Sequence, residues 1–195
     1  MTSRPIPELA IAARDVLSLL DAAGIRACVI GALAVHRWGE PRATSDADFS
    51  ALAPYGDELP VVDLLLSHLE PRRADARAFA LANRVLLVKT REGVEIDVAL
   101  AAFPFEVEAL DESSSWEIVP GVSLRTCPAE HLVVYKLVAA RGRDLVDVEG
   151  IVRRQRQRLD VDRIRQWGRI FAELKEEPDL LRPFEDVWRT IEPGR

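Results

Sequence analysis

Two aspartates, Asp46 and Asp48, are separated by one residue in a short run that alternates polar and apolar side chains. Side chains of an extended strand alternate faces with period two, so both carboxylates must point to the same side of a sheet. A third aspartate, Asp97, lies in a similar run, Val-Glu-Ile-Asp-Val-Ala-Leu. Clustered carboxylates repel one another unless a cation such as Mg²⁺ neutralises them. The pattern predicts a metal-dependent phosphoryl or nucleotidyl transfer site, with surface aspartates at strand ends as the alternative.

The bulk properties are those of an ordinary globular protein. A length of 195 residues fits one domain, or a core with a helical extension, and hydrophobic residues make up 48%. A net charge of −6 argues against a surface built to coat nucleic acid. Cys28 and Cys127 are too few for a disulfide framework, and no apolar leader or run of about 18 apolar residues occurs. We expect a cytoplasmic protein without a membrane segment.

Periodicity predicts an α/β (α+β) chain with a mixed sheet, flanking helices and a C-terminal helical bundle. The predicted strands are 26–30, 46–52, 84–89, 94–100, 116–119 and 122–125. The predicted helices are 7–23, 33–38, 58–69, 129–141, 145–159, 161–174 and 180–191. Composition changes to helix formers after Pro128, so we expect a core domain over 1–127 and a helical domain over 128–195.

Gly31 and Ala32 stand where a predicted strand passes directly into a helix. Backbone N–H groups and the positive end of a helix dipole at such a junction can face an anion, so this turn is placed to touch phosphate. An ordinary turn is the alternative. Thirteen residues then intervene between Ala32 and Asp46.

This arrangement resembles the nucleotidyltransferase superfamily typified by DNA polymerase β, whose signature is Gly followed by Gly or Ser, a spacer of about this length, and Asp-x-Asp. More narrowly, the sequence is similar to the abortive-infection nucleotidyltransferase toxins of the AbiEii type and their uncharacterised relatives. The segments that carry this similarity are Gly31-Ala-Leu-Ala-Val, Pro41-Arg-Ala-Thr-Ser-Asp-Ala-Asp and Tyr135-Lys-Leu-Val-Ala-Ala-Arg-Gly-Arg-Asp-Leu-Val-Asp. The resemblance implies a nucleotidyltransferase core in the first 127 residues.

The resemblance assigns the three aspartates to catalysis. Asp46 and Asp48 would coordinate two Mg²⁺ ions that hold the triphosphate of a nucleotide. Asp97 would complete the metal site and help to deprotonate the acceptor hydroxyl. Two ions roughly 3.5–4 Å apart stabilise the attacking and leaving oxygens of an in-line displacement.

Other residues receive supporting roles from the same resemblance. Lys136, on an apolar helix, would contact nucleotide phosphates, although a lysine that extends its ammonium to solvent is equally compatible. We expect Asp144 to pair with Lys136, with Asp147 on the same helix face. Arg42 would contact phosphate or brace its loop, and Thr44 would hydrogen-bond the turn.

One residue departs from the family pattern. Ala32 replaces the usual Gly or Ser, so a hydroxyl that could reach the γ-phosphate is absent while the backbone N–H remains. The substitution would be strained only if the loop required a positive φ at this position.

The sequence therefore predicts an enzyme that transfers a nucleoside monophosphate from a nucleoside triphosphate to an acceptor hydroxyl. The acceptor could be a tRNA end, a protein or a small molecule such as an aminoglycoside, and a toxin paired with an antitoxin partner is the leading context. The arginine-rich tract 153–158 favours RNA, whereas the acidic net charge suits a cationic small molecule. A catalytically silent binding module and a metal-dependent phosphohydrolase are the alternatives.

Overall fold

The structure, a computed structural model, describes residues 4–191. These residues divide into two compact units: the first contains the chain up to Leu33 together with 43–127, and the second contains 34–42 together with the chain from Pro128 onward. The predicted mixed α+β class is confirmed. Within residues 4–191 no helix combines the length and the apolar character needed to cross a membrane.

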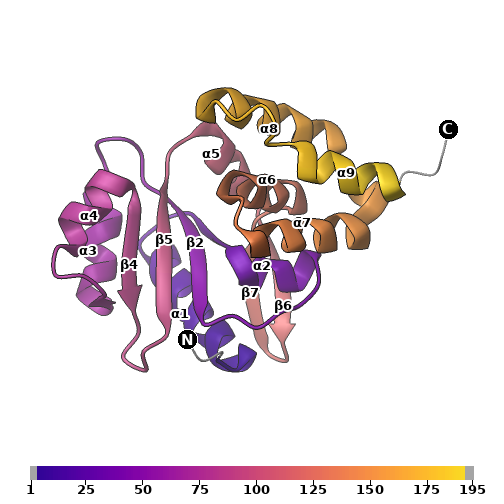
Figure 1. Cartoon of the computed structure of the whole chain (residues 1–195). Helices are drawn as coiled ribbons and strands as arrows, with labels where there is room; N and C mark the ends of the chain where they lie inside the picture. Colours follow the sequence, from indigo (N-terminus) through magenta and orange to yellow (C-terminus); the bar gives the residue numbers. More distant parts are fainter. Residues whose placement is uncertain (1–3, 192–195) are drawn as a thin grey trace. The chain divides into compact units, whose positions relative to one another are not determined.

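The first unit is built on a seven-stranded mixed sheet with the strand order β3-β4-β5-β2-β1-β7-β6. The strands are β1 (Ala27–Ile30), β2 (Asp46–Leu52), β3 (Glu70–Pro71), β4 (Val85–Lys89), β5 (Glu95–Ala101), β6 (Ser114–Val119) and β7 (Val122–Thr126). The central strand β2 is parallel to β5 and antiparallel to β1. Figure 1 shows β4, β5 and β2 side by side. The two predicted carboxylate-bearing strands are therefore neighbours.

Helices cover one face of this sheet. They are α1 (Ile6–Ala22), α3 (Leu59–His68) and α4 (Ala76–Asn83). The helix α5 (Pro104–Asp111) contacts β2, and α2 (Gly31–Trp38) starts at the end of β1. The helix α1 packs on β1 and β7, while α3 and α4 lie against β4 (Figure 1). The predicted helix 7–23 corresponds to α1, and Gly24 follows it with φ +72° and donates its N–H to the Asp21 carbonyl at 3.0 Å.

Strict alternation along β2 and β5 separates a buried face from a polar one. The side chains that these strands contribute to the hydrophobic core are Ala47, Phe49, Ala51, Ile96, Val98 and Leu100. Asp46 and Asp48 occupy the intervening positions of β2 and are only partly buried. The apolar positions thus fix which way the carboxylates point, because a shift by one residue would bring the aspartates into the core.

The second unit is a helical bundle. Its helices are α6 (Ala129–Ala139), α7 (Gly142–Gln155), the short 3₁₀-helix η1 (Arg156–Arg158), α8 (Val161–Lys175) and α9 (Arg182–Ile191). The helix α6 packs against α7 and α8, and α7 against α9. The segment 34–42 joins this bundle, since the side chains of Arg154 and Gln155 donate to the carbonyls of Gly39 and Trp38.

Several local predictions were wrong. The strand β3 and the helices α4 and α5 were not predicted, because β3 has only two residues and α4 buries only Ala76 and Ala80. The predicted helices 129–141 and 145–159 have different bounds. The first ends at 139 because Ala140 adopts φ +50°, and α7 ends at 155 because Arg156 has φ +49°.

Replacing Phe49 by alanine should lower the free energy of unfolding by about 3–5 kcal/mol, because the ring is fully buried and its loss leaves a cavity between strand and helices. Urea denaturation followed by circular dichroism measures this. Leu81→Ala is the control, since that side chain is 41% exposed and its loss should cost about 0.5 kcal/mol. Equal stabilities of the two variants would contradict the assignment of Phe49 to the core.

Candidate active site

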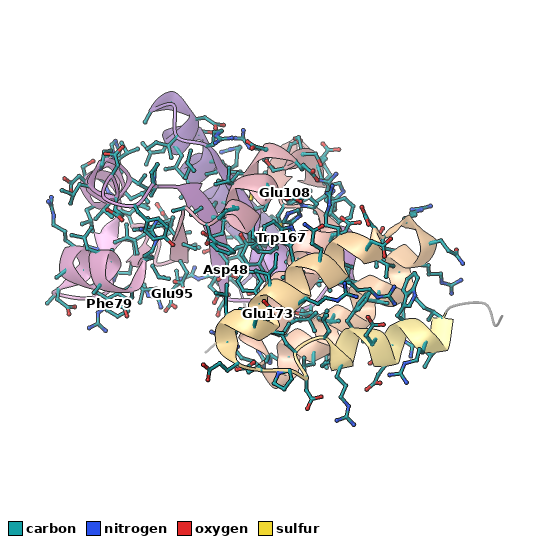
Figure 2. All side chains as sticks on the ribbon, turned by 90° about the horizontal axis from the view of Figure 1, so that it is seen from above. Asp48, Phe79, Glu95, Glu108, Trp167 and Glu173 are labelled. Atoms are coloured by element: carbon teal, nitrogen blue, oxygen red, sulfur yellow. The ribbon has the colours of Figure 1, made fainter. Side chains whose placement is uncertain are left out.

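Four carboxylates share one face of the sheet in the first unit. The parallel strands β2 and β5 pair Asp46 with Glu95 and Asp48 with Asp97. Residues paired in this way point to the same side, so all four side chains lie on the face opposite the hydrophobic core. Figure 2 labels Asp48 and Glu95, which come from these two neighbouring strands. We name Asp46, Asp48, Glu95 and Asp97 the acidic group.

Gly31 makes room for one member of this group. It follows β1, adopts φ +62°, and a Cβ built on it would overlap the carboxylate of Asp48. Only glycine meets both requirements without strain. Ala32 is the next residue in α2 and is not among the described residues with positive φ, so its methyl group fits the helix without backbone strain.

Thr44 orients a second member. Its Oγ1 donates a hydrogen bond to Oδ1 of Asp46 at 2.6 Å, and the Thr44 side chain is buried. The sequence predicted a hydrogen bond to the turn, but the hydroxyl bonds mainly the carboxylate two residues later. The carboxyl group of Asp46 therefore reaches the sheet face in a fixed orientation.

Sequence reasoning missed two residues of this site. Glu95 lies two positions before Asp97, and the same period-two rule that linked Asp46 and Asp48 could have found it. Arg72 follows the unpredicted strand β3. One arm of its guanidinium donates to Oδ1 of Asp97, and the other lies 3.1 Å from Oε2 of Glu95. No local sequence pattern indicates a contact between Arg72 and Asp97, which are 25 positions apart in the chain.

Crowding of negative charge perturbs the Asp97 carboxyl. Burial raises its pKa above the ordinary value, and the carboxylates of Asp46 and Glu95 act in the same direction. The Arg72 guanidinium opposes them without cancelling them. The surroundings of Asp97 therefore favour its protonated form.

The acidic group fits a hard divalent cation. Its donors are all carboxylate oxygens, the ligand type that Mg²⁺ takes, and they come from two rigid, hydrogen-bonded strands. The missing side chain of Gly31 leaves space that the Asp48 carboxylate uses. Asp46, Asp48 and Asp97 are the residues that would hold the ion.

A second charged cluster lies in the helical unit. The Lys136 ammonium is 2.9 Å from Oδ1 of Asp144 and 2.9 Å from Oδ2 of Asp147. Arg42 donates from Nε and Nη2 to the two oxygens of Asp147 at 2.8 and 2.9 Å. We name these four residues the buried ion network. The predicted pairing of Lys136 with Asp144 is confirmed, and Asp147 is bonded by both cations.

The network determines the charge state of Asp147, which is 3% exposed. Burial alone would raise the pKa of this carboxyl, but the hydrogen bonds from Arg42 and Lys136 outweigh burial and hold the pKa below its usual range. Arg42 thereby ties the segment 34–42 to α7 inside the second unit.

Other candidate residues have local roles. Cys28 and Cys127 are free and buried, and burial raises the pKa of the Cys28 thiol to about 12. His36 bonds the carbonyl of Arg42 through Nε2 at 2.8 Å. In the arginine-rich tract, Arg153 pairs with Glu149 one turn earlier at 2.8 Å.

Comparisons with known proteins support the fold. No protein-family model and no curated protein matches the sequence. An antigenic nucleotidyltransferase-like protein from Paracoccidioides brasiliensis is similar in structure, with a TM-score of 0.53 at 14% identity over 94% of this chain and 95% of that one. ANT(2")-Ia, solved in complex with adenylyl-2"-tobramycin, has a TM-score of 0.53 at 11% identity over 85% and 98% of the two chains. The chain has a nucleotidyltransferase-like fold.

Gly31→Ala should destabilise the protein more than Gly121→Ala does. Both glycines have positive φ, which costs about 1–2 kcal/mol for alanine, but the new methyl group at Gly121 meets nothing within 4 Å. At Gly31 it meets the Asp48 carboxylate, which adds about 1–3 kcal/mol of overpacking. Urea denaturation compares the two variants, and equal losses would show that Asp48 does not depend on Gly31.

Asp147→Asn should lower the free energy of unfolding by about 3–5 kcal/mol at neutral pH. The substitution leaves the positive charges of Arg42 and Lys136 with only one carboxylate, that of Asp144, in a largely buried site. The folded-state pKa of Asp147 is lowered, so its stabilisation is present above the unfolded-state pKa of about 3.9 and is lost as the pH falls through the folded-state pKa. Denaturation of wild type and variant at a series of pH values should give a constant difference down to about pH 5 that shrinks below about pH 4.

Asp162→Asn is the matched control, since Asp162 is exposed on α8 in the same unit. A stability difference for Asp147→Asn that persists undiminished in acid would show that the charge of Asp147 is not what stabilises the network.

Proposed function

We propose that the protein is a divalent-metal-dependent nucleotidyltransferase. It transfers a nucleoside monophosphate from a nucleoside triphosphate to an acceptor hydroxyl and releases pyrophosphate. The observation that carries the proposal is the in-register pairing of Asp48 with Asp97 and of Asp46 with Glu95, which gathers four carboxylates on one face of a nucleotidyltransferase-like fold.

In this proposal the three aspartates share the tasks, and Asp97 both completes the metal site and serves the acceptor. Asp46 and Asp48 bind Mg²⁺, with two ions as the expected number, and the bound metal supplies charge stabilisation for the attacking and leaving oxygens. Asp97 accepts the proton of the acceptor hydroxyl, while that oxygen bonds the α-phosphorus and the bond to the β-phosphate bridge oxygen breaks. The raised pKa of Asp97 suits a general base better than an ordinary aspartate would.

Further residues of each unit have proposed supporting roles. The N–H groups of Gly31 and Ala32 at the start of α2 are suited to a phosphate. Within the second unit, taken by itself, Lys136 pairs with Asp144 and Asp147, and the resemblance supports a contact of this lysine with a nucleotide phosphate. Asp144 orients this lysine. Thr44, just before the Asp-x-Asp segment, orients Asp46, and Arg42 holds the end of the segment 34–42 on α7.

For the acceptor we favour a small cationic molecule of the aminoglycoside type. The chain carries a net charge of −6, and the acidic group adds local negative potential that attracts a polyamine. The structurally similar ANT(2")-Ia was solved with adenylyl-2"-tobramycin. The resemblance of 135–147 to AbiEii-type toxins supports a second candidate, a cytoplasmic toxin with an antitoxin partner that modifies tRNA or a protein hydroxyl.

Incubation with each α-³²P-labelled nucleoside triphosphate and Mg²⁺ tests the proposal. Aminoglycosides, tRNA and cell extract are offered as separate acceptors, and the labelled product is identified. Label on an aminoglycoside supports the favoured acceptor, and label on tRNA or protein supports the toxin. Free labelled monophosphate would instead indicate a phosphohydrolase. Absence of nucleotide binding in isothermal titration would indicate a silent module.

Asp48→Asn should reduce transfer by at least about 100-fold, because it removes a charged oxygen ligand from the proposed metal site. Asp75→Asn is the control: this exposed aspartate of the same unit pairs with Arg73 and is not part of the acidic group. Product formation is measured with both variants after circular dichroism confirms that they are folded. Full activity of Asp48→Asn would refute the assignment of the acidic group.

A further inference from the structure

Arg72 contacts the acidic group with both arms of its guanidinium. Nη1 bonds Oδ1 of Asp97, and Nη2 lies 3.1 Å from Oε2 of Glu95. The guanidinium therefore contacts two different carboxylates. In the more usual bidentate arrangement, both of its arms bond one carboxylate. All three side chains are partly exposed, at 25–35%. The contact is accessible to an ion that enters from solvent.

The backbone of Arg72 lies in register with Asp97 across β4. The two-residue strand β3 pairs with β4, and the next N–H, that of Arg72, donates to the Leu87 carbonyl at 3.1 Å. Leu87 is in turn the partner of Asp97 in the β4–β5 ladder. The side chain thus has to cross β4 to reach β5, a span of about 9–10 Å between strands two apart. This span suits the length of an arginine.

Arginine and a divalent cation would compete for the same oxygens. The acidic group concentrates four carboxylates, and the positive charge of Arg72 lowers their mutual repulsion. A divalent ion bound to Asp97 would lie close to the Arg72 guanidinium, which bonds the same carboxylate. Two positive charges at this short distance repel strongly when they are partly shielded from water. Bonding of Arg72 to Asp97 and full occupation of the metal site therefore oppose each other.

We propose that Arg72 is a built-in counter-ion of the metal site. Its single positive charge is shared by Asp97 and Glu95 while no divalent ion is present, it leaves Asp97 when the ion binds, and it thereby lowers the metal affinity of the acidic group. The inference rests on the proposed function in one respect, because it takes the acidic group to be the metal site.

The test measures Mn²⁺ binding to the full chain without nucleotide, by isothermal titration and by the electron paramagnetic resonance signal of free Mn²⁺. Arg72→Gln should bind Mn²⁺ about tenfold more tightly than wild type, since one repelling and competing charge is gone. In EDTA the same variant should melt at a lower temperature than wild type. Saturating Mn²⁺ should raise its melting temperature by more than it raises that of wild type.

Arg73→Gln is the matched control. Arg73 is the adjacent arginine, but it pairs with Asp75 and lies over the Phe79 ring at 4.2 Å, away from the acidic group. Its substitution should leave Mn²⁺ affinity unchanged. Arg72→Lys retains the charge but cannot fork between two carboxylates, and its affinity should fall between those of wild type and Arg72→Gln.

Unchanged or weaker Mn²⁺ binding by Arg72→Gln would overturn the counter-ion role and make Arg72 a fixed support. If that variant does not fold, the ¹⁵Nε resonance of Arg72 is measured in the wild type, and it is assigned by its loss in Arg72→Lys. This resonance should shift on addition of Mg²⁺, while the resonance of Arg73 should not. An Arg72 resonance that does not move would overturn the inference. Failure of the wild type and Asp48→Asn alike to bind Mn²⁺ would instead overturn the proposed function.

Discussion

The parallel, in-register pairing of β2 with β5 is the constraint on which the site depends. It sets Asp48 beside Asp97, and the alternation of both strands buries Phe49 on the opposite face. A slip of one residue would exchange these faces and place ionised carboxylates in the core, which is far more costly than any gain in pairing. The burial that stabilises the first unit therefore also orients its carboxylates, so fold and candidate site share one cause.

The two charged clusters differ in how their charge is balanced. In the buried ion network, Arg42 and Lys136 match Asp144 and Asp147 one for one, and deep burial requires this neutrality. In the acidic group Arg72 offsets only one of four carboxylates, and these side chains remain partly exposed. The first arrangement suits a rigid structural support. The second retains excess negative charge, and this is why the proposed cation site lies on the sheet.

The sequence predicted the parts of the molecule that alternation controls. The bounds of β2 were predicted without error, because apolar residues recur at every second position from Ala47 to Ala51 and Pro54 follows the strand. The Lys136–Asp144 pair could be predicted because a lysine on an apolar helix needs an oppositely charged partner. Arg72 could not be found, because its contact depends on a two-residue strand that places it beside β4. Likewise, the bond from Arg42 to Asp147 joins residues 105 positions apart, a distance that no periodicity encodes.

Ala32, where the sequence differs from the motif that it otherwise resembles, lies at a position that tolerates alanine. Gly31 carries both the left-handed backbone and the close approach of Asp48, so glycine is needed there. Ala32 already lies in α2, where a methyl group favours the helix. Alanine in place of Gly or Ser leaves the N–H groups at the helix start, which are the proposed phosphate donors. The change at Ala32 thus affects a secondary polar contact and leaves the backbone geometry of the turn intact.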